Sequence, residues 1–144
     1  MTDNPQFCIG VNTIVVRDGK LLLGMRKNCY GAGTWALPGG HLEQGEGLAE
    51  GAARELLEET GMIPEKMEFT NIVNNPQEES RHYIQIGFEA IGTIGEPENK
   101  EPDRCEEWRW FDMSKLPENV FPNHKEQIEL FVTKDYRYGE KGSV

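Results

Sequence analysis

Residues 40–62 read GHLEQGEGLAEGAARELLEETGM, and this acidic segment is the most informative part of the chain. From Leu48 to Thr60 it contains no proline and is rich in Leu, Ala, Glu and Arg, which predicts a helix. Gly61 follows the last of these residues and Pro64 lies just beyond, so we expect the helix to end at Gly61. With Pro38-Gly39-Gly40 in front, the expected unit is a loop, a helix and a second loop.

Three glutamates of this helix are expected to lie together. Glu55, Glu58 and Glu59 are spaced so that their Cβ atoms are about 5–6 Å apart on one face. Like charges at this spacing are mildly destabilising, so the cluster needs a compensating cation. Clustered carboxylate oxygens suit hard divalent ions such as Mg²⁺ or Mn²⁺.

A plainer interpretation is a solvated acidic helix face. Glu50, Arg54 and Glu58 stand four residues apart and can form surface ion pairs worth a few tenths of a kcal/mol each. The glycines on both sides favour the metal site instead. A glycine-rich approach brings main-chain carbonyls close to a metal and main-chain N–H groups close to a phosphate.

The spacing of the whole segment resembles the Nudix box. It runs Gly40, five residues, Glu46, seven residues, Arg54-Glu55-Leu56, one residue, Glu58-Glu59, one residue and Gly61-Met62. The resemblance implies an α/β fold, a Nudix-like α/β/α sandwich with a mixed β-sheet and a loop–helix–loop catalytic segment. It implies one domain over residues 1–144 that cleaves nucleoside diphosphates linked to another group.

The resemblance also implies roles for single residues. Glu55, Glu58 and Glu59 match the metal-binding and catalytic acids of the family, and Glu55 or Glu58 is the expected general base. Arg54 matches the arginine that orients these acids, and Glu46 matches an outlying acid that assists the metal. The carbonyl of Gly39 or Gly40 matches the backbone metal ligand. The implied cofactor is Mg²⁺, with Mn²⁺ as an alternative.

Other segments are similar to small MutT-like nucleoside triphosphate diphosphatases, with the Nudix 15 type as the nearest likeness. They are LLLGMRK, GTWALPGGHLE, NIVNN, HYIQIGFEA and EPDRCEEWRWFDMSKLP. This subgroup hydrolyses (deoxy)nucleoside triphosphates, and we include modified ones, to monophosphate and pyrophosphate. Two alternatives stay open: a diphosphatase of ADP-ribose or nucleoside diphosphate sugars, and a binding module that has lost catalysis. Such modules usually lose box acids, whereas all are present here.

Candidate substrate contacts lie outside the helix. Arg26 and His41 are candidates for holding phosphate, although a surface cation and a structural histidine are the plainer interpretations. A base needs an apolar wall and a few polar groups, for which Leu37, Trp110, Phe111 and Gln85 are candidates, with Trp35, Trp108 and Asn74 behind them. The aromatic residues could equally belong to the core.

Composition limits the partners. The chain has 25 acidic and 15 basic residues and a formal charge of −10, which opposes binding to long nucleic acids and permits a small nucleotide substrate. The mean hydropathy is −0.63, no apolar run is long enough for a membrane span, and residues 1–7 show no secretory signal. Three scattered cysteines fit a reducing cytoplasm. We therefore expect a cytoplasmic protein, and similarity to the subgroup suggests a homodimer.

The remaining pattern predicts one mixed sheet between two helices. Strands are expected at 7–16, 20–25, 35–37, 67–74, 82–91 and 107–111. Asp18-Gly19 indicates a hairpin between the first two strands, and residues 75–81 are expected to form a polar loop. The segment after Pro122 has apolar positions at Ile128, Phe131 and Val132, which predicts an amphipathic helix.

Overall fold

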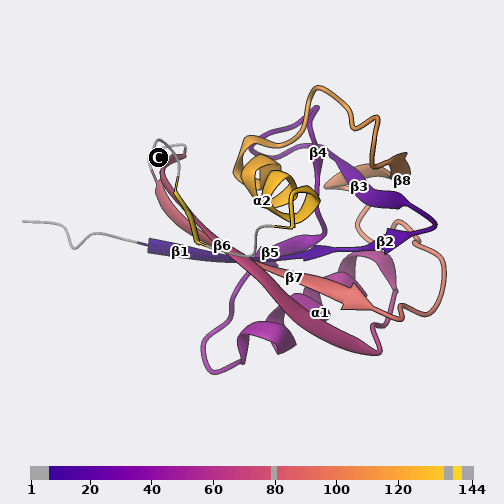
Figure 1. Cartoon of the computed structure of the whole chain (residues 1–144), viewed down its shortest axis with the longest axis horizontal. Helices are drawn as coiled ribbons and strands as arrows, with labels where there is room; N and C mark the ends of the chain where they lie inside the picture. The colour runs from indigo at the N-terminus through magenta and orange to yellow at the C-terminus, as the bar shows by residue number, and fades with distance from the viewer. Residues whose placement is uncertain (1–6, 79–80, 135–137, 141–144) are drawn as a thin grey trace, which may run out of the picture.

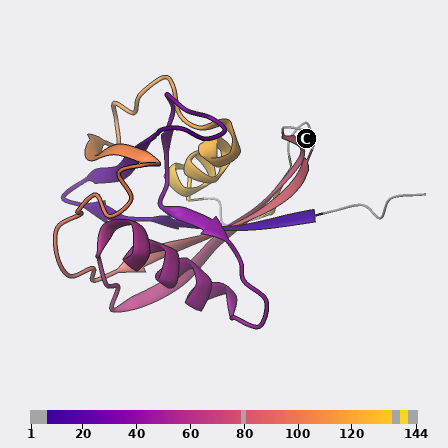
Figure 2. The same cartoon turned by 180° about the vertical axis from the view of Figure 1, so that it is seen from behind.

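The computed structural model describes residues 7–78, 81–134 and 138–140, which form two β-sheets and two helices (Figure 1). The prediction that residues 1–7 contain no secretory signal falls outside this part, except for Phe7. In both views the first sheet runs through the middle of the molecule, with α1 on one side and α2 on the other (Figures 1 and 2). This is the predicted α/β sandwich.

The first sheet is mixed and has the strand order β5-β1-β7-β6-β9. Its strands are β1 (Phe7–Ile14), β5 (Gly39–His41), β6 (Lys66–Glu78), β7 (Arg81–Ile91) and β9 (Tyr138–Glu140). β1 lies parallel to β7, and β6 lies parallel to β9, whereas β5 with β1 and β6 with β7 are antiparallel. β5 is short but decisive, because it brings Gly39 and Gly40 beside β1.

The second sheet is antiparallel and was not expected as a separate sheet. It contains β2 (Val16–Arg17), β3 (Lys20–Arg26), β4 (Trp35–Ala36) and β8 (Cys105–Asp112), with β3 paired to each of the others. Asp18 and Gly19 join β2 to β3 with φ of 53° and 75°, which confirms the predicted hairpin. The chain passes from the first sheet to the second at Val15, which is fully buried.

Helix α1 (Leu48–Thr60) forms where the sequence predicts it. At its start the Gly47 N–H donates to the Glu50 carboxylate at 2.9 Å. Ala52, Leu56 and Thr60 are buried and recur every four residues, so one stripe faces the first sheet. The helix ends at Gly61, whose φ of 77° is left-handed and whose N–H donates to Leu57 O at 2.9 Å.

The segment 92–104 is joined to this end of α1. The Glu98 N–H donates to Thr60 O at 2.9 Å, and the Lys100 N–H donates to Glu59 O at 3.2 Å. These bonds satisfy carbonyls that the last helical turn leaves without intrahelical partners.

Helix α2 (Pro122–Val132) covers the opposite face of the first sheet. The predicted amphipathic helix is present: of its apolar positions Ile128 and Phe131 are buried, whereas Val132 is 46% exposed. The predicted polar loop over 75–81 was also too long: β6 continues to Glu78 and β7 begins at Arg81, and residues 79–80 lie outside the described part.

The left-handed conformation of Gly61 generates a test of the fold. We expect Gly61→Ala to lower the free energy of unfolding by about 1 kcal/mol, because a left-handed conformation costs a residue with a Cβ atom about that much. Gly61→Asn should lose clearly less, since asparagine tolerates this conformation. Urea unfolding followed by circular dichroism measures both variants. Equal losses would instead implicate crowding against Lys100 and Glu98, the side chains nearest to an added Cβ.

Candidate active site

A cavity of about 630 Å³ opens between the two sheets. It is bordered by the C-terminal half of α1 and by the first turn of α2. It collects most of the residues that the sequence indicates. Among the candidates, the lining includes Arg26, Leu37, Gly39, Gly40, His41, Arg54, Glu55, Glu58, Glu59 and Gln85. Segments far apart in the chain therefore contribute to one concave surface, as ligand sites require.

Two helix acids lie directly against the glycine pair. Glu59 Oε1 accepts a hydrogen bond from the Gly39 N–H at 2.8 Å. A Cβ atom on Gly40 would stand 2.5 and 2.6 Å from the two carboxylate oxygens of Glu55. A side chain at position 40 would push the Glu55 carboxylate away, so the glycine allows this acid to lie against β5.

Arg54 is the cation that the acidic helix needs. Its Nη1 donates to Glu55 Oε1 at 2.9 Å and reaches both oxygens of Glu58 at 3.3 Å. Its Nε and Nη2 both donate to Glu46 at 2.9 Å, and Nη2 also donates to His41 O at 3.1 Å. These contacts raise the pKa of Arg54, chiefly through Glu46, and they lower the pKa of Glu46 to about 2.

The acids at the cavity carry unusual proton affinities. Burial raises the pKa of Glu59 well above its ordinary value, against the Gly39 hydrogen bond, and the charges of Glu55 and Glu101 raise it further. Burial likewise raises the pKa of Glu55, with Arg54 opposing. Glu101, which the sequence did not single out, lines the same cavity. Closely spaced carboxylates of raised pKa mark a place where a positive charge would be strongly stabilised.

The oxygen atoms around Gly40 suit a hard divalent ion, although the carboxylates of Glu55 and Glu58 accept hydrogen bonds from Arg54 in this structure. Within the described residues no three carboxylate, imidazole or thiol groups stand together as a preformed metal cluster. The fit rests on the space over Gly40, which a Cβ would fill, and on oxygen donors only: Glu55, Glu58, Glu59 and the carbonyls of Gly39 and Gly40. Such a donor set suits Mg²⁺ or Mn²⁺ rather than a soft metal.

The other end of the cavity is apolar with a few polar groups. Leu37, Phe121, Asn123 and His124 line it, and each is at most 5% exposed. The chain segment that contains Phe121 and the start of α2 is fixed to β4, because the Phe121 N–H donates to Trp35 O at 2.8 Å. The Leu37 N–H donates to His124 Nδ1 at 3.0 Å, which holds the two chain segments together a second time.

The histidine at this end is neutral. Burial, with the nearby charge of Arg26, lowers the pKa of His124 to about 3. Since Nδ1 accepts the Leu37 N–H, the ring proton of the neutral imidazole is on Nε2. His124 thus presents one fixed tautomer to its surroundings.

Arg26 lies between the acidic and the apolar ends. Its guanidinium stacks over the Phe121 ring at 4.1 Å, and its Nε donates to Tyr30 O at 2.8 Å. Its charge lowers the pKa of both Glu59 and His124. His41 lies at the rim, where its Nε2 is 3.1 Å from the Tyr83 hydroxyl. Arg26 and His41, the two residues predicted to contact phosphate, therefore both line the cavity.

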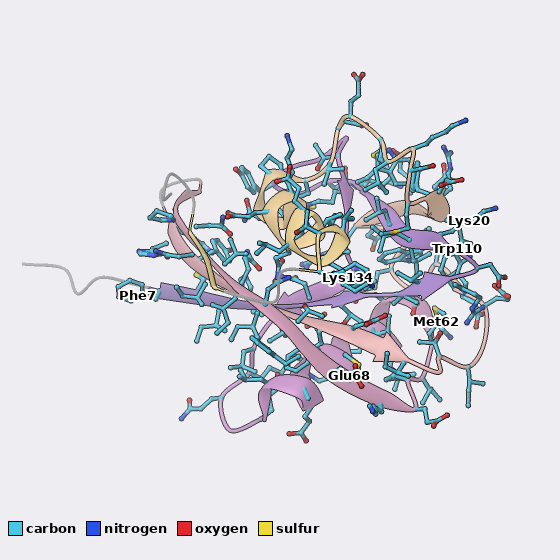
Figure 3. The ribbon with its side chains drawn as sticks, viewed as in Figure 1. Phe7, Lys20, Met62, Glu68, Trp110 and Lys134 are labelled. Atoms are coloured by element: carbon cyan, nitrogen blue, oxygen red, sulfur yellow. The ribbon has the colours of Figure 1, made fainter. Side chains whose placement is uncertain are left out.

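Glu46, Phe111 and Trp110 do not line this cavity, and neither do the further candidates Trp35 and Asn74. Both oxygens of Glu46, the acid expected to assist a metal, accept hydrogen bonds from Arg54. Phe111 packs edge-on against Trp35 at 4.8 Å in the core. Trp110 lies near Lys20, as Figure 3 shows, with Arg17 stacked 5.2 Å from its ring centroid. The structure therefore does not bring Trp110 and Phe111, which were expected to touch a base, to the cavity that holds the other candidates.

The tryptophan that does line the cavity is Trp108, two residues earlier on β8. Trp108 pairs with Gly24, and a Cβ there would stand only 2.7–2.9 Å from the indole ring. Two residues shift a side chain by roughly 7 Å along a strand, which takes Trp110 away from the cavity. Phe121, Asn123 and His124 were missed as site residues, because the sequence around Pro122 signals only a helix start.

Comparisons with known proteins agree with this geometry. A family model described as NUDIX domain matches residues 7–131. The chain is 36% identical over 135 residues to an ADP-ribose pyrophosphatase of Methanocaldococcus jannaschii, covering 93% of this chain and 75% of the relative. It is also 36% identical over 105 residues to an oxidized purine nucleoside triphosphate hydrolase of Danio rerio, covering 72% and 65%.

A solved structure is similar over nearly its whole length. The MutT NUDIX hydrolase of Burkholderia pseudomallei superposes with a TM-score of 0.81 and 32% sequence identity, covering 86% of this chain and 97% of that one. No described helix here is long and apolar enough to cross a membrane.

The neutral state of His124 generates a test by pH. Its pKa is lowered in the folded protein to about 3, from 6.5 when exposed, so the stability it contributes is complete above pH 6.5 and is lost as the pH falls toward 3. From pH 7 to 5 the wild type should lose about 2 kcal/mol more than His124→Asn, whose Oδ1 can still accept the Leu37 N–H. Urea unfolding across this range measures the difference. Parallel pH curves would show that His124 becomes protonated within the fold.

Proposed function

This chain belongs to the NUDIX domain family of phosphoanhydride hydrolases, and we propose that it hydrolyses (deoxy)nucleoside triphosphates to monophosphate and pyrophosphate with a divalent metal. Modified nucleotides are included among the proposed substrates. One observation carries the proposal: carboxylates on α1 and an apolar, amide-bearing end share one cavity, with Arg26 between them. A nucleotide has the same order of parts, namely a phosphate chain at one end and a base at the other.

The site residues have distinct proposed roles. Glu55, Glu58 and Glu59, with a carbonyl of Gly39 or Gly40, would hold the metal, for which we propose Mg²⁺ with Mn²⁺ as an alternative. A bound divalent ion neutralises phosphate oxygens and lowers the pKa of a water molecule. Glu55 or Glu58 would accept the proton of the attacking water, and Arg54 holds both carboxylates in place for this.

The chain's cations would bind the phosphates. Arg26 would contact an oxygen of the phosphate chain, since its guanidinium already lies over Phe121 in the cavity. His41 would donate to another oxygen from the rim. Attack of water on the phosphorus next to the nucleoside then releases pyrophosphate.

A second candidate activity has its own support. The relative from Methanocaldococcus jannaschii is an ADP-ribose pyrophosphatase and matches 93% of this chain. ADP-ribose also places a base and a pyrophosphate in one molecule, so the same cavity would serve. Its hydrolysis would give AMP and ribose phosphate.

Partners and location extend the proposal. The formal charge of −10 favours a small nucleotide over a long nucleic acid polymer as the substrate. We further propose a cytoplasmic protein, on the three scattered cysteines, and a homodimer, on the similarity to the MutT-like subgroup. The Nudix 15 likeness stays a prediction.

Substitutions that remove the charge but keep the shape of the side chain test the metal acids. Glu55→Gln and Glu59→Gln should each lower kcat/KM at least about 100-fold, because each removes a carboxylate from the reacting centre. Glu50→Gln is the matched control: it removes an equal charge from the first turn of α1, is exposed, and does not line the cavity. Excess chelator should abolish turnover of the wild type. Unchanged turnover in both test variants would refute the assignment.

Product analysis separates the candidate activities. The panel contains common and oxidised (deoxy)nucleoside triphosphates and ADP-ribose, each with Mg²⁺ in ¹⁸O-labelled water. We expect monophosphate plus pyrophosphate from the triphosphates, with the label in the monophosphate because water attacks the phosphorus next to the nucleoside. AMP and ribose phosphate from ADP-ribose alone would favour the second candidate. No hydrolysis of any compound would identify a binding module.

A further inference from the structure

Helix α2 meets the first sheet partly through polar side chains. Gln127 of α2 is fully buried, and its Nε2 is 2.9 Å from the position that an ideal Cβ on Gly87 of β7 would occupy. Thr70 Oγ1 and Asn71 Oδ1 of β6 are 2.9 and 2.8 Å from the same position. The three polar atoms therefore surround one point between the sheet and the helix that covers it in Figure 1.

A β-bulge in β6 explains why two consecutive residues both approach Gly87. The pairing of β6 with β7 passes from Phe69 and Phe88 directly to Asn71 and Gly87. Thr70 is therefore an extra residue of β6, with no residue opposite it in β7. Consecutive side chains of a regular strand point to opposite faces, whereas a bulge redirects one of them. The bulge thus brings the Thr70 hydroxyl and the Asn71 amide to the same place.

These three atoms are buried without satisfying their hydrogen-bonding capacity. Thr70 Oγ1, Asn71 Oδ1 and Gln127 Nε2 have no hydrogen-bond partner within the described part of the chain. Their residues are at most 2% exposed, so bulk solvent does not reach them. Buried polar atoms in native proteins are nearly always bonded to protein or to ordered water, because an unpartnered one is strongly destabilising. Three such atoms around one point indicate a shared partner.

The chemistry of the three atoms identifies that partner as water. Gln127 Nε2 can only donate, since the other atom of this amide, Oε1, accepts from Asn12 Nδ2 at 3.0 Å. Asn71 Oδ1 can only accept, and the Nδ2 of the same amide donates to Gln127 O at 3.2 Å. The amide protons would repel a cation, and the amide oxygen would repel an anion. Water both donates and accepts, and a buried water typically makes about three hydrogen bonds.

We propose that one internal water molecule binds beside Gly87 and bridges Thr70 and Asn71 of β6 to Gln127 of α2. Glycine makes this possible, because a Cβ less than 3 Å from nitrogen and oxygen atoms would clash and would occupy space that the water needs. The water is then one member of a buried chain of hydrogen bonds between α2 and the sheet.

This chain of hydrogen bonds reaches the candidate active site. From Gln127 it continues to Asn12, whose Nδ2 also donates to Gln85 Oε1 at 2.6 Å. Asn12 and Gln85 line the cavity, so the bound water supports the cavity wall from behind. The site requires no nucleotide, and it exists whether or not the proposed hydrolysis is observed.

High-resolution crystal structures test for the water directly. The wild type should show an ordered water within hydrogen-bond distance of Thr70 Oγ1, Asn71 Oδ1 and Gln127 Nε2. Gly87→Ala should lack it, because the added methyl group takes its place. Thr13→Val is the matched control and should keep it, since Thr13 is also fully buried with an unpartnered Oγ1 but is not among the residues nearest to Gly87. A wild type without this water would overturn the inference.

Thr70→Val provides a second test that does not depend on the folding of Gly87→Ala. Valine nearly keeps the shape of threonine but lacks the hydroxyl group. If water binds this hydroxyl, the equilibrium constant for unfolding should rise about 5-fold, which is the net contribution of one hydrogen bond. Urea unfolding measures the constant. An unchanged or lower constant would contradict the proposal, because removing a hydroxyl that has no partner does not destabilise the fold.

Discussion

Arg54 is the charge on which the rest of the site depends. It contacts Glu46, Glu55 and Glu58 at 2.9–3.3 Å, and Glu43 approaches at 3.6 Å. Without this cation, carboxylates one helical turn apart would repel each other and turn outward to solvent. With it, Glu55 stays over Gly40, and Glu46 ties the loop before the helix to the helix itself. The same arginine therefore stabilises the local fold and arranges the acids.

The two sheets explain how one cavity can contain both acids and an apolar end. The first sheet carries Gly39, Gly40 and Gln85, and the second carries Met25, Arg26 and Trp108. Each helix lies on one face of the first sheet, and both reach the cavity, α1 with its acids and α2 with its first turn. Arg26 stands where these contributions meet, stacked on Phe121 and close enough to Glu59 to affect its pKa. The order of groups along the cavity follows from this layering.

The parts of the fold that could be predicted are those with local causes. Helix α1, its end at Gly61 and the hairpin at Asp18-Gly19 all follow from residue types within a few positions. The acids and Arg54 were also found, because their spacing is local. The division into two sheets was not, since it depends on the pairing of β3 with β8, which lie far apart in the chain. The apolar end of the cavity was missed for the same reason: Asn123 and His124 line it only because the start of α2 is hydrogen-bonded to Trp35 and Leu37. We predicted Trp110 rather than Trp108 as the tryptophan of the site, because the sequence does not show which of the two pairs with Gly24.

The segment 92–104 is hydrogen-bonded to the end of α1, so this loop is a poor site for an insertion. The N–H groups of Glu98 and Lys100 donate to the carbonyls of Thr60 and Glu59. An insertion there would therefore loosen the helical turn that carries Glu59. The Asp18-Gly19 turn has no such connection to the acids, and a Cβ on Gly19 would meet nothing within 4 Å. A fluorophore or a short affinity tag would therefore be better attached at the hairpin than in the longer, more conspicuous loop.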